Sequence, residues 1–303
     1  MHNHNNQHEH SHHHHAHNTS SKRIGWAFFL NVSFTIIEFI GGWLTNSTAI
    51  MADAVHDLGD SLSIGMAWVL NKLGQKQVSS NFTYGYKRLS LLGALINSVV
   101  LIFGSAWVLF EAVPRLAEPQ MPHTEGMLLM AIFGMAVNGF AAYKLSGGET
   151  LNERVLNWHL FEDVLGWAAV FIVSVVLMFA DWPILDPLLS IGFTLFILFN
   201  VMRSLKQTVT LFLQASPDRQ TQQTLLDALL KLDKVVDVHH VHFWSLDGQN
   251  HVLTAHLVLN DLLDGAQLIA LKHEVLISLQ PFQLAHTTIE FELPSESCRD
   301  AAD

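Results

Sequence analysis

The sequence predicts an α-helical membrane protein that carries a small α+β domain at its C-terminal end. Half of the 303 residues are hydrophobic and only 14% are charged, a composition that is common in membrane proteins and rare in soluble domains. Six apolar segments are each long enough to cross a bilayer as a helix, which takes about 20 residues. After residue 212 the pattern changes to short amphipathic helices and strands.

We expect the six apolar segments to form six transmembrane helices, because a helix satisfies its backbone hydrogen bonds internally, as the bilayer interior demands. Their limits are 24–44, 49–70, 89–112, 126–147, 157–180 and 184–211, within a membrane domain at 21–213. In this topology Arg115 is the only Lys or Arg near a helix end on one side of the membrane. The others near helix ends lie on the opposite side of the membrane. The positive-inside rule therefore predicts that both termini are cytoplasmic.

Residues 214–294 are predicted to form the small α+β domain, followed by a tail at 295–303. Leucines from Leu225 to Leu232 recur at helical spacing, and residues 267–279 are helical again. VVDVHHVHFWSL and HVLTAHLVLN resemble two strands around the turn DGQN, and HTTIEFEL closes the domain as a strand. The order α-β-β-α-β suits a sheet with its helices on one face.

The N-terminal segment is rich in histidine. Nine of the 19 histidines precede residue 18, in the sequence MHNHNNQHEHSHHHHAHNTS. We expect residues 1–20 to be a disordered tail, because they cannot bury a core. The histidines alternate with Asn, Gln and Glu, which favours a native metal-attracting tail over a purification tag.

Two global counts exclude other classes of protein. The chain has one cysteine, so a disulfide framework within it is impossible. The net charge of −11 argues against a nucleic-acid partner.

Ionisable residues interrupt two of the predicted membrane helices with the same spacing. ADAVHDLGDSL places His56 and Asp60 four residues apart, and NWHLFEDVLGW does the same with His159 and Asp163. Each pair shares one helix face at about 100° per residue, and such side chains face the bundle interior or an aqueous cavity. Two imidazoles and two carboxylates can form the tetrahedral shell that suits Zn²⁺. A hydrogen bond within the bundle is the alternative for a single pair, and the second copy favours metal binding.

Other acidic residues lie close to these pairs. Asp53 precedes His56 by three residues and lies near the same face, so it is an accessory candidate for relaying protons or guiding the ion. Asp57 and Glu162 point away from the paired faces. Glu38, a lone carboxylate in the first segment, is expected to be structural.

The chain resembles the cation diffusion facilitator family, in particular its bacterial zinc and cadmium efflux members. The likeness covers residues 22–293 and is strongest in FIGGWLTNSTAIMADAVHDLGD, YGYKRLSLLGALINSVVLI, WHLFEDVLG, DPLLS, DVHHVHFWSL and TAHLVL. The resemblance implies a homodimer in the bacterial inner membrane, with six transmembrane helices and a cytosolic ferredoxin-like domain. It further implies Zn²⁺ efflux in exchange for protons, with Cd²⁺ as a second substrate. The transport site that it implies consists of His56, Asp60, His159 and Asp163.

The resemblance also implies metal ligands in the C-terminal domain. The matching positions are His239, His256, His286 and Glu292, and His273 on the second helix of that domain is a further candidate. Strand alternation places His240 and His242 on one face and His239 on the other. A zinc ion here would be regulatory or would stabilise the dimer, and the alternative is that these are surface histidines.

Transport by alternating access is the function that two matched ligand pairs favour. Metal ligands must lose protons in order to bind, and imidazole titrates near neutral pH, so protons are natural counter-ions. A membrane zinc sensor, or a carrier of Fe²⁺, Co²⁺ or Ni²⁺, remains an alternative because N/O sites bind all of these ions. An enzyme is not expected, since the chain has no His-Glu-x-x-His motif. The basic residues of the 71–88 loop suit anionic lipid headgroups.

Overall fold

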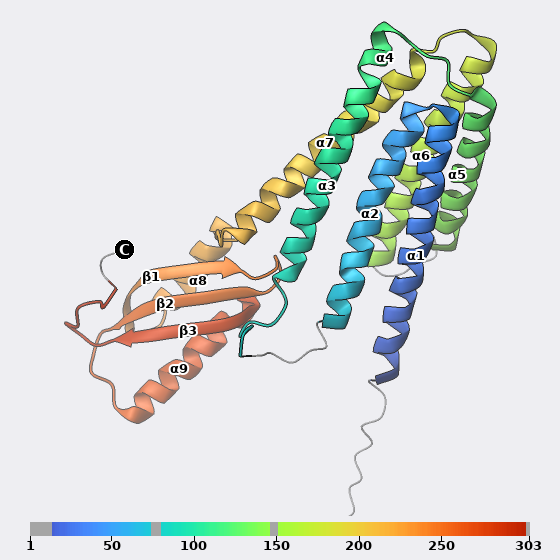
Figure 1. The fold of residues 1–303 in the computed structure, drawn as a ribbon. Coiled ribbons are helices and arrows are strands. Elements are labelled where there is room, and N and C mark those ends of the chain that lie inside the picture. The colour runs from blue at the N-terminus through green and yellow to red at the C-terminus, as the bar shows by residue number, and fades with distance from the viewer. Residues whose placement is uncertain (1–13, 74–79, 146–150, 301–303) are drawn as a thin grey trace, which may run out of the picture. The chain divides into compact units, whose positions relative to one another are not determined.

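The computed structural model describes residues 14–73, 80–145 and 151–300, apart from the side chains at 14–24, 71–72, 144–145 and 151–159. The chain divides into two compact units (Figure 1). The first combines residues up to 75 with 96–204 and contains most of the long helices. The second combines 76–95 with 205–303 and contains the C-terminal sheet.

All six apolar segments of the sequence are helical in the described residues. The long helices are α1 (His14–Thr45), α2 (Thr48–Leu73), α3 (Leu89–Ala112), α5 (Thr124–Leu145), α6 (Leu151–Phe179) and α7 (Leu185–Phe212), with the single turn α4 (Pro114–Ala117) after α3. Helix α1 begins at His14, so it reaches into the histidine-rich segment, whose residues 1–13 lie outside the described part of the chain.

Five of these helices are long and apolar enough to cross a membrane, judged by length and composition over the described residues. The exception is α2, whose apolar run is interrupted by His56 and by three carboxylates, Asp53, Asp57 and Asp60. His56, Asp60 and the accessory candidate Asp53 are residues for which the sequence predicts a function, and all four ionisable residues lower the hydropathy of the helix that carries them.

A tryptophan fixes the distance between α5 and α6. Trp167 of α6 is fully buried among Phe34 of α1 and Met127 and Ala131 of α5. Its indole ring lies over Gly134 of α5, where a Cβ atom would come within 2.2 Å of the ring carbon Cδ2. A glycine is therefore required at this close approach.

The start of α2 is held by a buried aspartate of α7. The Asp186 carboxylate accepts hydrogen bonds from the Ser47 hydroxyl (2.5 Å), the Thr48 backbone N–H (2.7 Å) and the Thr48 hydroxyl (2.8 Å). The Ser190 hydroxyl donates to the Thr48 carbonyl oxygen at 2.9 Å. The Asp186 carboxylate also accepts from the Ala49 N–H at 3.3 Å, so it satisfies two N–H groups that a helix start leaves without an intrahelical partner.

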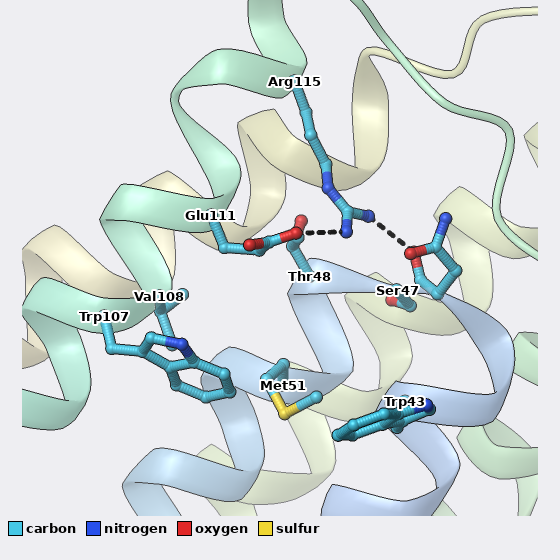
Figure 2. A pocket seen from close by; sticks show the side chains of 10 residues that line it. Trp43, Ser47, Thr48, Met51, Trp107, Val108, Glu111 and Arg115 are labelled. Atoms are coloured by element: carbon cyan, nitrogen blue, oxygen red, sulfur yellow. Dashed lines mark hydrogen bonds and ion pairs between the residues drawn. The ribbon is translucent and has the colours of Figure 1, made fainter.

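A cavity of about 290 Å³ lies beside the turn between α1 and α2 (Figure 2). Arg115 reaches across it, donating to the Asn46 carbonyl oxygen at 2.9 Å and pairing with Glu111 at 2.6 Å. Asn46 has a φ of 53°, the left-handed conformation that lets the chain turn. Glu111 is the only carboxylate among the lining residues, so this cavity ties the turn together and does not offer a metal-ligand set.

The C-terminal unit has the predicted order α-β-β-α-β. Its elements are α8 (Arg219–Leu230), β1 (Val235–Ser245), β2 (His251–Leu259), α9 (Gly265–Leu279), the 3-10 turn η1 (Gln280–Phe282) and β3 (Leu284–Glu292). The sheet order is β1-β2-β3, with β1 antiparallel and β3 parallel to β2. Helix α9 supplies the crossover that a parallel pair requires.

The two helices of this unit pack on one face of the sheet. Leu253 and Leu257 of β2 are buried in a core shared with Leu225 of α8 and Leu271 of α9. Successive side chains of a strand point to opposite faces, so His256 lies on the face away from this core.

A β-bulge breaks the regular alternation of β1. His239 is opposite His256 and His242 is opposite Thr254, so two residues of β1 face one residue of β2. His240, within the bulge, has a φ of 49°. The prediction that His239 takes the face opposite to His240 was wrong, because the rings of both residues contact the His256 ring, with centroids 5.7 and 4.8 Å away.

Candidate metal sites

Three of the four predicted transport-site residues come together in the helical unit. The His56 Nε2 atom lies 3.7 Å from Asp60 Oδ2, one turn further along α2. The same nitrogen lies 3.9 Å from Asp163 Oδ1 on α6. Because two helices contribute to this cluster, it is a tertiary feature of the bundle.

His159 is the fourth predicted ligand. It lies in α6, four residues before Asp163, but its side chain is outside the described part of the structure. Helical spacing gives it a place one turn from Asp163, and its role as a ligand stays a prediction.

The cluster opens into a cavity of about 370 Å³ between α2, α3, α6 and α7. Asp53 also lines it, and its Oδ1 atom lies 3.6 Å from the point where a Cβ atom at Gly166 would be. Glu162 lines it as well, although the sequence placed this residue off the ligand face. A cavity is wider than one row of side chains, so a residue 100° away from the row can still reach its wall.

The lining adds one amide that sequence reasoning missed, Asn200 of α7. A polar residue within the apolar run of α7 is the signal that could have identified it. The lining residues include four carboxylates and no Lys or Arg. Such a set of charges attracts cations.

Two further buried carboxylates lie near the acidic residues of the cavity. Asp57 of α2 is buried and is not among the lining residues, as its helical position predicted. Glu38 of α1 is fully buried, with Asp57 and Asp53 as ionisable neighbours. The acidic character of the site therefore extends from α2 into α1.

A second group of ligand atoms lies on the open face of the C-terminal sheet. It comprises His239, His256, Glu292 and Cys298, with one ligand atom from each lying within 4.8 Å of all the others. His256 Nδ1 is 2.8 Å from Glu292 Oε1, and His239 Nε2 is 3.2 Å from Glu292 Oε2. Both His256 and Glu292 are buried, which is unusual for ionisable groups unless they are paired or bind a metal.

The other ring nitrogen of His256 faces a smaller group. His240, His256 and Asp300 can also bring three ligand atoms within 4.8 Å of one another. His242 Nε2 lies 3.2 Å from His240 Nε2. The β-bulge of β1 is what brings the His240 ring against His256.

The two remaining histidine candidates lie elsewhere among the described residues. The His286 ring packs edge-on against Tyr84, with centroids 4.8 Å apart. His273 is exposed on α9. Neither contributes to the two groups of ligand atoms. Sequence reasoning missed His240, Cys298 and Asp300 as members; the presence of the chain's only cysteine just after the last strand was the available signal.

The ionisable side chains of this second group influence one another's pKa values. Desolvation alone would raise the pKa of Glu292, but hydrogen bonds with His256, Cys298 and His239 outweigh it and lower that pKa. Desolvation raises the pKa of the Cys298 thiol, and the neighbouring Glu292 carboxylate adds to the increase. Glu292 is therefore ready to bind a cation, while Cys298 retains its proton until a cation displaces it.

An acidic cavity inside a bundle of apolar helices, together with a sheet domain that gathers imidazoles, a thiol and carboxylates, defines a membrane protein that handles metal cations. Comparison with known families makes this specific. Residues 26–213 match the cation efflux transmembrane domain, and residues 217–293 match the cytoplasmic domain of cation efflux proteins. The chain belongs to the cation efflux family, as the resemblance to cation diffusion facilitators predicted.

Named relatives are similar over most of their length. A cadmium, cobalt and zinc/H(+)-K(+) antiporter of Bacillus velezensis is 32% identical over 88% of this chain and 86% of its own. The zinc transporter ZitB of Pectobacterium atrosepticum is 32% identical over 90% of this chain and 86% of its own. The metal cation efflux system protein CzcD of Cupriavidus metallidurans is 28% identical over 91% of this chain and 88% of its own.

Proposed function

We propose that the protein exports Zn²⁺, and also Cd²⁺, from the cytoplasm in exchange for protons. The convergence of His56, Asp60 and Asp163 in one cavity is the observation that carries this proposal. Family membership supports it, as do the printed names of relatives, which include a zinc transporter and a cadmium, cobalt and zinc antiporter.

The ligand set favours a borderline-soft cation. His56 and His159 would supply nitrogen, while Asp60 and Asp163 would supply oxygen, and four such ligands suit tetrahedral Zn²⁺. Imidazole disfavours Mg²⁺ and Ca²⁺, which prefer oxygen shells. Asp53 and Glu162, on the same cavity wall, would guide the ion by their charge.

Proton exchange follows from competition for the same atoms. A proton and a metal ion cannot occupy one lone pair, so metal binding releases protons and protonation releases the metal. His56 would take up a proton on the outward-facing side and lose it on the cytoplasmic side. The carrier then returns with its charges neutralised, which completes an alternating-access cycle.

The proposed membrane topology has six spans with both termini in the cytoplasm of a bacterial cell, in its inner membrane. Helix α2, the second of the long helices, would be the span that the five apolar helices leave out. Its 26 residues extend about 39 Å at 1.5 Å per residue, enough to cross the hydrocarbon core. Bound cations or protons neutralise the carboxylates that lower its hydropathy. The C-terminal domain would be cytosolic and ferredoxin-like, and it would pair two chains into a homodimer, consistent with the family domain that it matches.

The C-terminal domain is proposed to hold a regulatory zinc ion through His239, His256 and Glu292. These residues fit the ion because two imidazole nitrogens and a carboxylate with lowered pKa converge on one point. When bound, the ion would cross-link β1, β2 and β3, the strands that carry the three residues.

The test of the transport proposal is zinc uptake into inverted membrane vesicles with an imposed pH gradient. Wild-type protein should take up Zn²⁺ and release protons, and Asp163→Asn should reduce both fluxes at least about tenfold, because a metal ligand loses its charge. Glu118→Gln is the matched control, since Glu118 is exposed after α4 and outside the cavity. Full transport by Asp163→Asn and by His159→Ala would overturn the site assignment.

Two alternatives have their own discriminating measurements. A membrane zinc sensor would bind the ion without lowering cellular zinc in a zinc-sensitive host. A carrier of Fe²⁺, Co²⁺ or Ni²⁺ would show preference for that ion in a metal panel on proteoliposomes, and cobalt in a relative's name makes Co²⁺ the first one to include.

A further inference from the structure

The chain folds back after its last strand. Strand β3 ends at Glu292, and a turn follows in which the Glu296 N–H donates to the Leu293 carbonyl oxygen at 3.0 Å. The Glu296 carboxylate accepts from the Leu293 N–H at 2.8 Å, and Ser295 takes a φ of 66°. This turn returns residues 297–300 to the open face of the sheet, beyond the end of the matched family domain at residue 293.

The returning tail places a thiol among the metal-binding side chains. Cys298 Sγ lies 3.4 Å from His256 Nδ1, and it interacts with the Glu292 carboxylate. Charge contacts join the tail to the sheet through the exposed pair between Arg299 and Glu290 at 3.1 Å and through Asp300, which lies 3.9 Å from His256 Nε2. Exposed pairs contribute little to stability, so an ion bound by Cys298 would hold the tail on the sheet more firmly.

We propose that Cys298 is the fourth ligand of the C-terminal metal site, so that a bound Zn²⁺ or Cd²⁺ ion clips the tail to the sheet. The proposal rests on the zinc site proposed above for His239, His256 and Glu292, and it adds a ligand from outside the family domain. It concerns the C-terminal domain alone and is independent of the transport cavity.

The ligand atoms lie within 4.8 Å of one another, and three of their contacts come near the spacing of a tetrahedral site. Zn–N and Zn–S bonds of about 2.0–2.3 Å put neighbouring ligand atoms about 3.3–3.7 Å apart in a tetrahedron. The contacts of Glu292 with His256 and His239 are 2.8 and 3.2 Å, and Cys298 lies 3.4 Å from His256. Small movements of the side chains would therefore complete the shell.

The two ring nitrogens of His256 face different groups. Its Nε2 atom faces the carboxylates of Glu290 at 3.7 Å and Asp300 at 3.9 Å. Its Nδ1 atom lies 2.8 Å from Glu292 and 3.4 Å from Cys298, so it is the nitrogen that points at the other proposed ligands. A bound ion would take the Nδ1 lone pair, and the carboxylates beside Nε2 would then accept the hydrogen bond of the remaining ring N–H, as carboxylates commonly do behind a metal-bound imidazole.

The ligand set determines which ion binds and how long the ion stays bound. A thiolate favours Zn²⁺ and Cd²⁺ over Mn²⁺ and Mg²⁺. Four ligands from one chain close the coordination shell, which is typical of structural sites that retain their metal. The ion would thus be held rather than passed on, and its loss would release the tail.

Co²⁺ provides a direct test, because a thiolate bound to it gives a charge-transfer absorption in the near ultraviolet. The full-length protein contains one cysteine, so the band can arise only from Cys298. Purified wild-type protein titrated with Co²⁺ should show the band, and Cys298→Ser should lose it completely. His56→Ala, which alters the transport cavity, should keep it.

A second measurement can begin with the wild-type protein. Zn²⁺ should slow alkylation of Cys298 by iodoacetamide at least about tenfold, because a metal-bound thiolate is a poor nucleophile. His256→Ala should abolish this protection, whereas Arg299→Gln, which weakens the exposed pairs with Glu290 and Asp300, should retain most of it.

The outcomes separate the two proposals. If the band is absent and Zn²⁺ leaves alkylation unchanged, while His256→Ala still lowers the number of bound Zn²⁺ ions, Cys298 is not a ligand and the three-ligand site stands. If His256→Ala changes neither the bound zinc nor the alkylation rate, the domain site itself is refuted. Zinc uptake by Cys298→Ser in vesicles reports separately on transport, and it should remain measurable in every case.

Discussion

Asp186, near the start of α7, accepts two hydrogen bonds from Thr48, the first residue of α2: one from its backbone N–H at 2.7 Å and one from its hydroxyl at 2.8 Å. One helix thus caps another in the interior of the bundle. Because His56 follows Thr48 on the same helix by about two turns, this contact helps to fix where the ligands of the transport cavity lie.

Asp186→Asn should destabilise the bundle and slow transport. The amide keeps the shape but replaces charge-assisted acceptors with one neutral acceptor and a donor, and loss of a helix cap costs about 0.5–2 kcal/mol. Thermal unfolding in detergent and zinc uptake in vesicles would both be measured. Asp181→Asn is the control, because Asp181 is exposed in the preceding loop. Unchanged unfolding and uptake in Asp186→Asn would show that the contact is dispensable.

Gly134→Ala should lower the thermal stability of the bundle, with a cost of about 1–3 kcal/mol for overpacking. The added methyl would collide with the Trp167 ring at 2.2 Å, and this ring has no space to move because it is fully buried. Gly139→Ala on the same helix is the matched control. Its methyl would meet only Val164 Cγ2 at 4.0 Å, so higher helix propensity should leave stability equal or slightly increased. Equal effects of the two substitutions would contradict the packing described for Trp167.

His56→Asp should change metal selectivity. The substitution replaces an imidazole nitrogen with oxygen in the cavity that contains Asp60 and Asp163, and oxygen-rich sites suit harder ions such as Mn²⁺. The ratio of Zn²⁺ to Mn²⁺ transport in proteoliposomes should fall at least about tenfold. His123→Asp, outside the cavity, should leave this ratio at the wild-type value. Relative rates that do not differ between His56→Asp and the wild type would refute the role of His56.

Deletion of residues 2–17 should raise the apparent half-saturation concentration for Zn²⁺ and leave the maximal rate nearly unchanged. Imidazoles bind zinc without needing a fixed geometry, so the histidine-rich segment should raise the local zinc concentration. The removed segment includes the first four residues of α1, so a variant with its histidines replaced by glutamine at constant length serves as the control. A collapse of the maximal rate in both variants would indicate a structural or gating role for the segment.

The long helices could be predicted from the sequence because apolar runs of this length have one stable form in a bilayer. His56, Asp60 and Asp163 could be predicted as neighbours because the helical period and the repeated spacing restrict them to inward faces. The hydrogen bonds between Asp186 and Thr48 could not be predicted, because they join residues 138 positions apart through tertiary packing. Cys298 was missed because it follows the last strand, where no periodic pattern indicates the path of the chain.

The bulge in β1 has a consequence for how the family domain can vary. On an unbroken strand, successive side chains point to opposite faces, so His239 and His240 could not both reach His256. One extra residue between His239 and His242 turns both rings toward the face of His256. Removing a single residue here would separate the imidazoles without changing the chemistry of any that remain. The metal affinity of this face therefore depends on the length of the strand as much as on its composition.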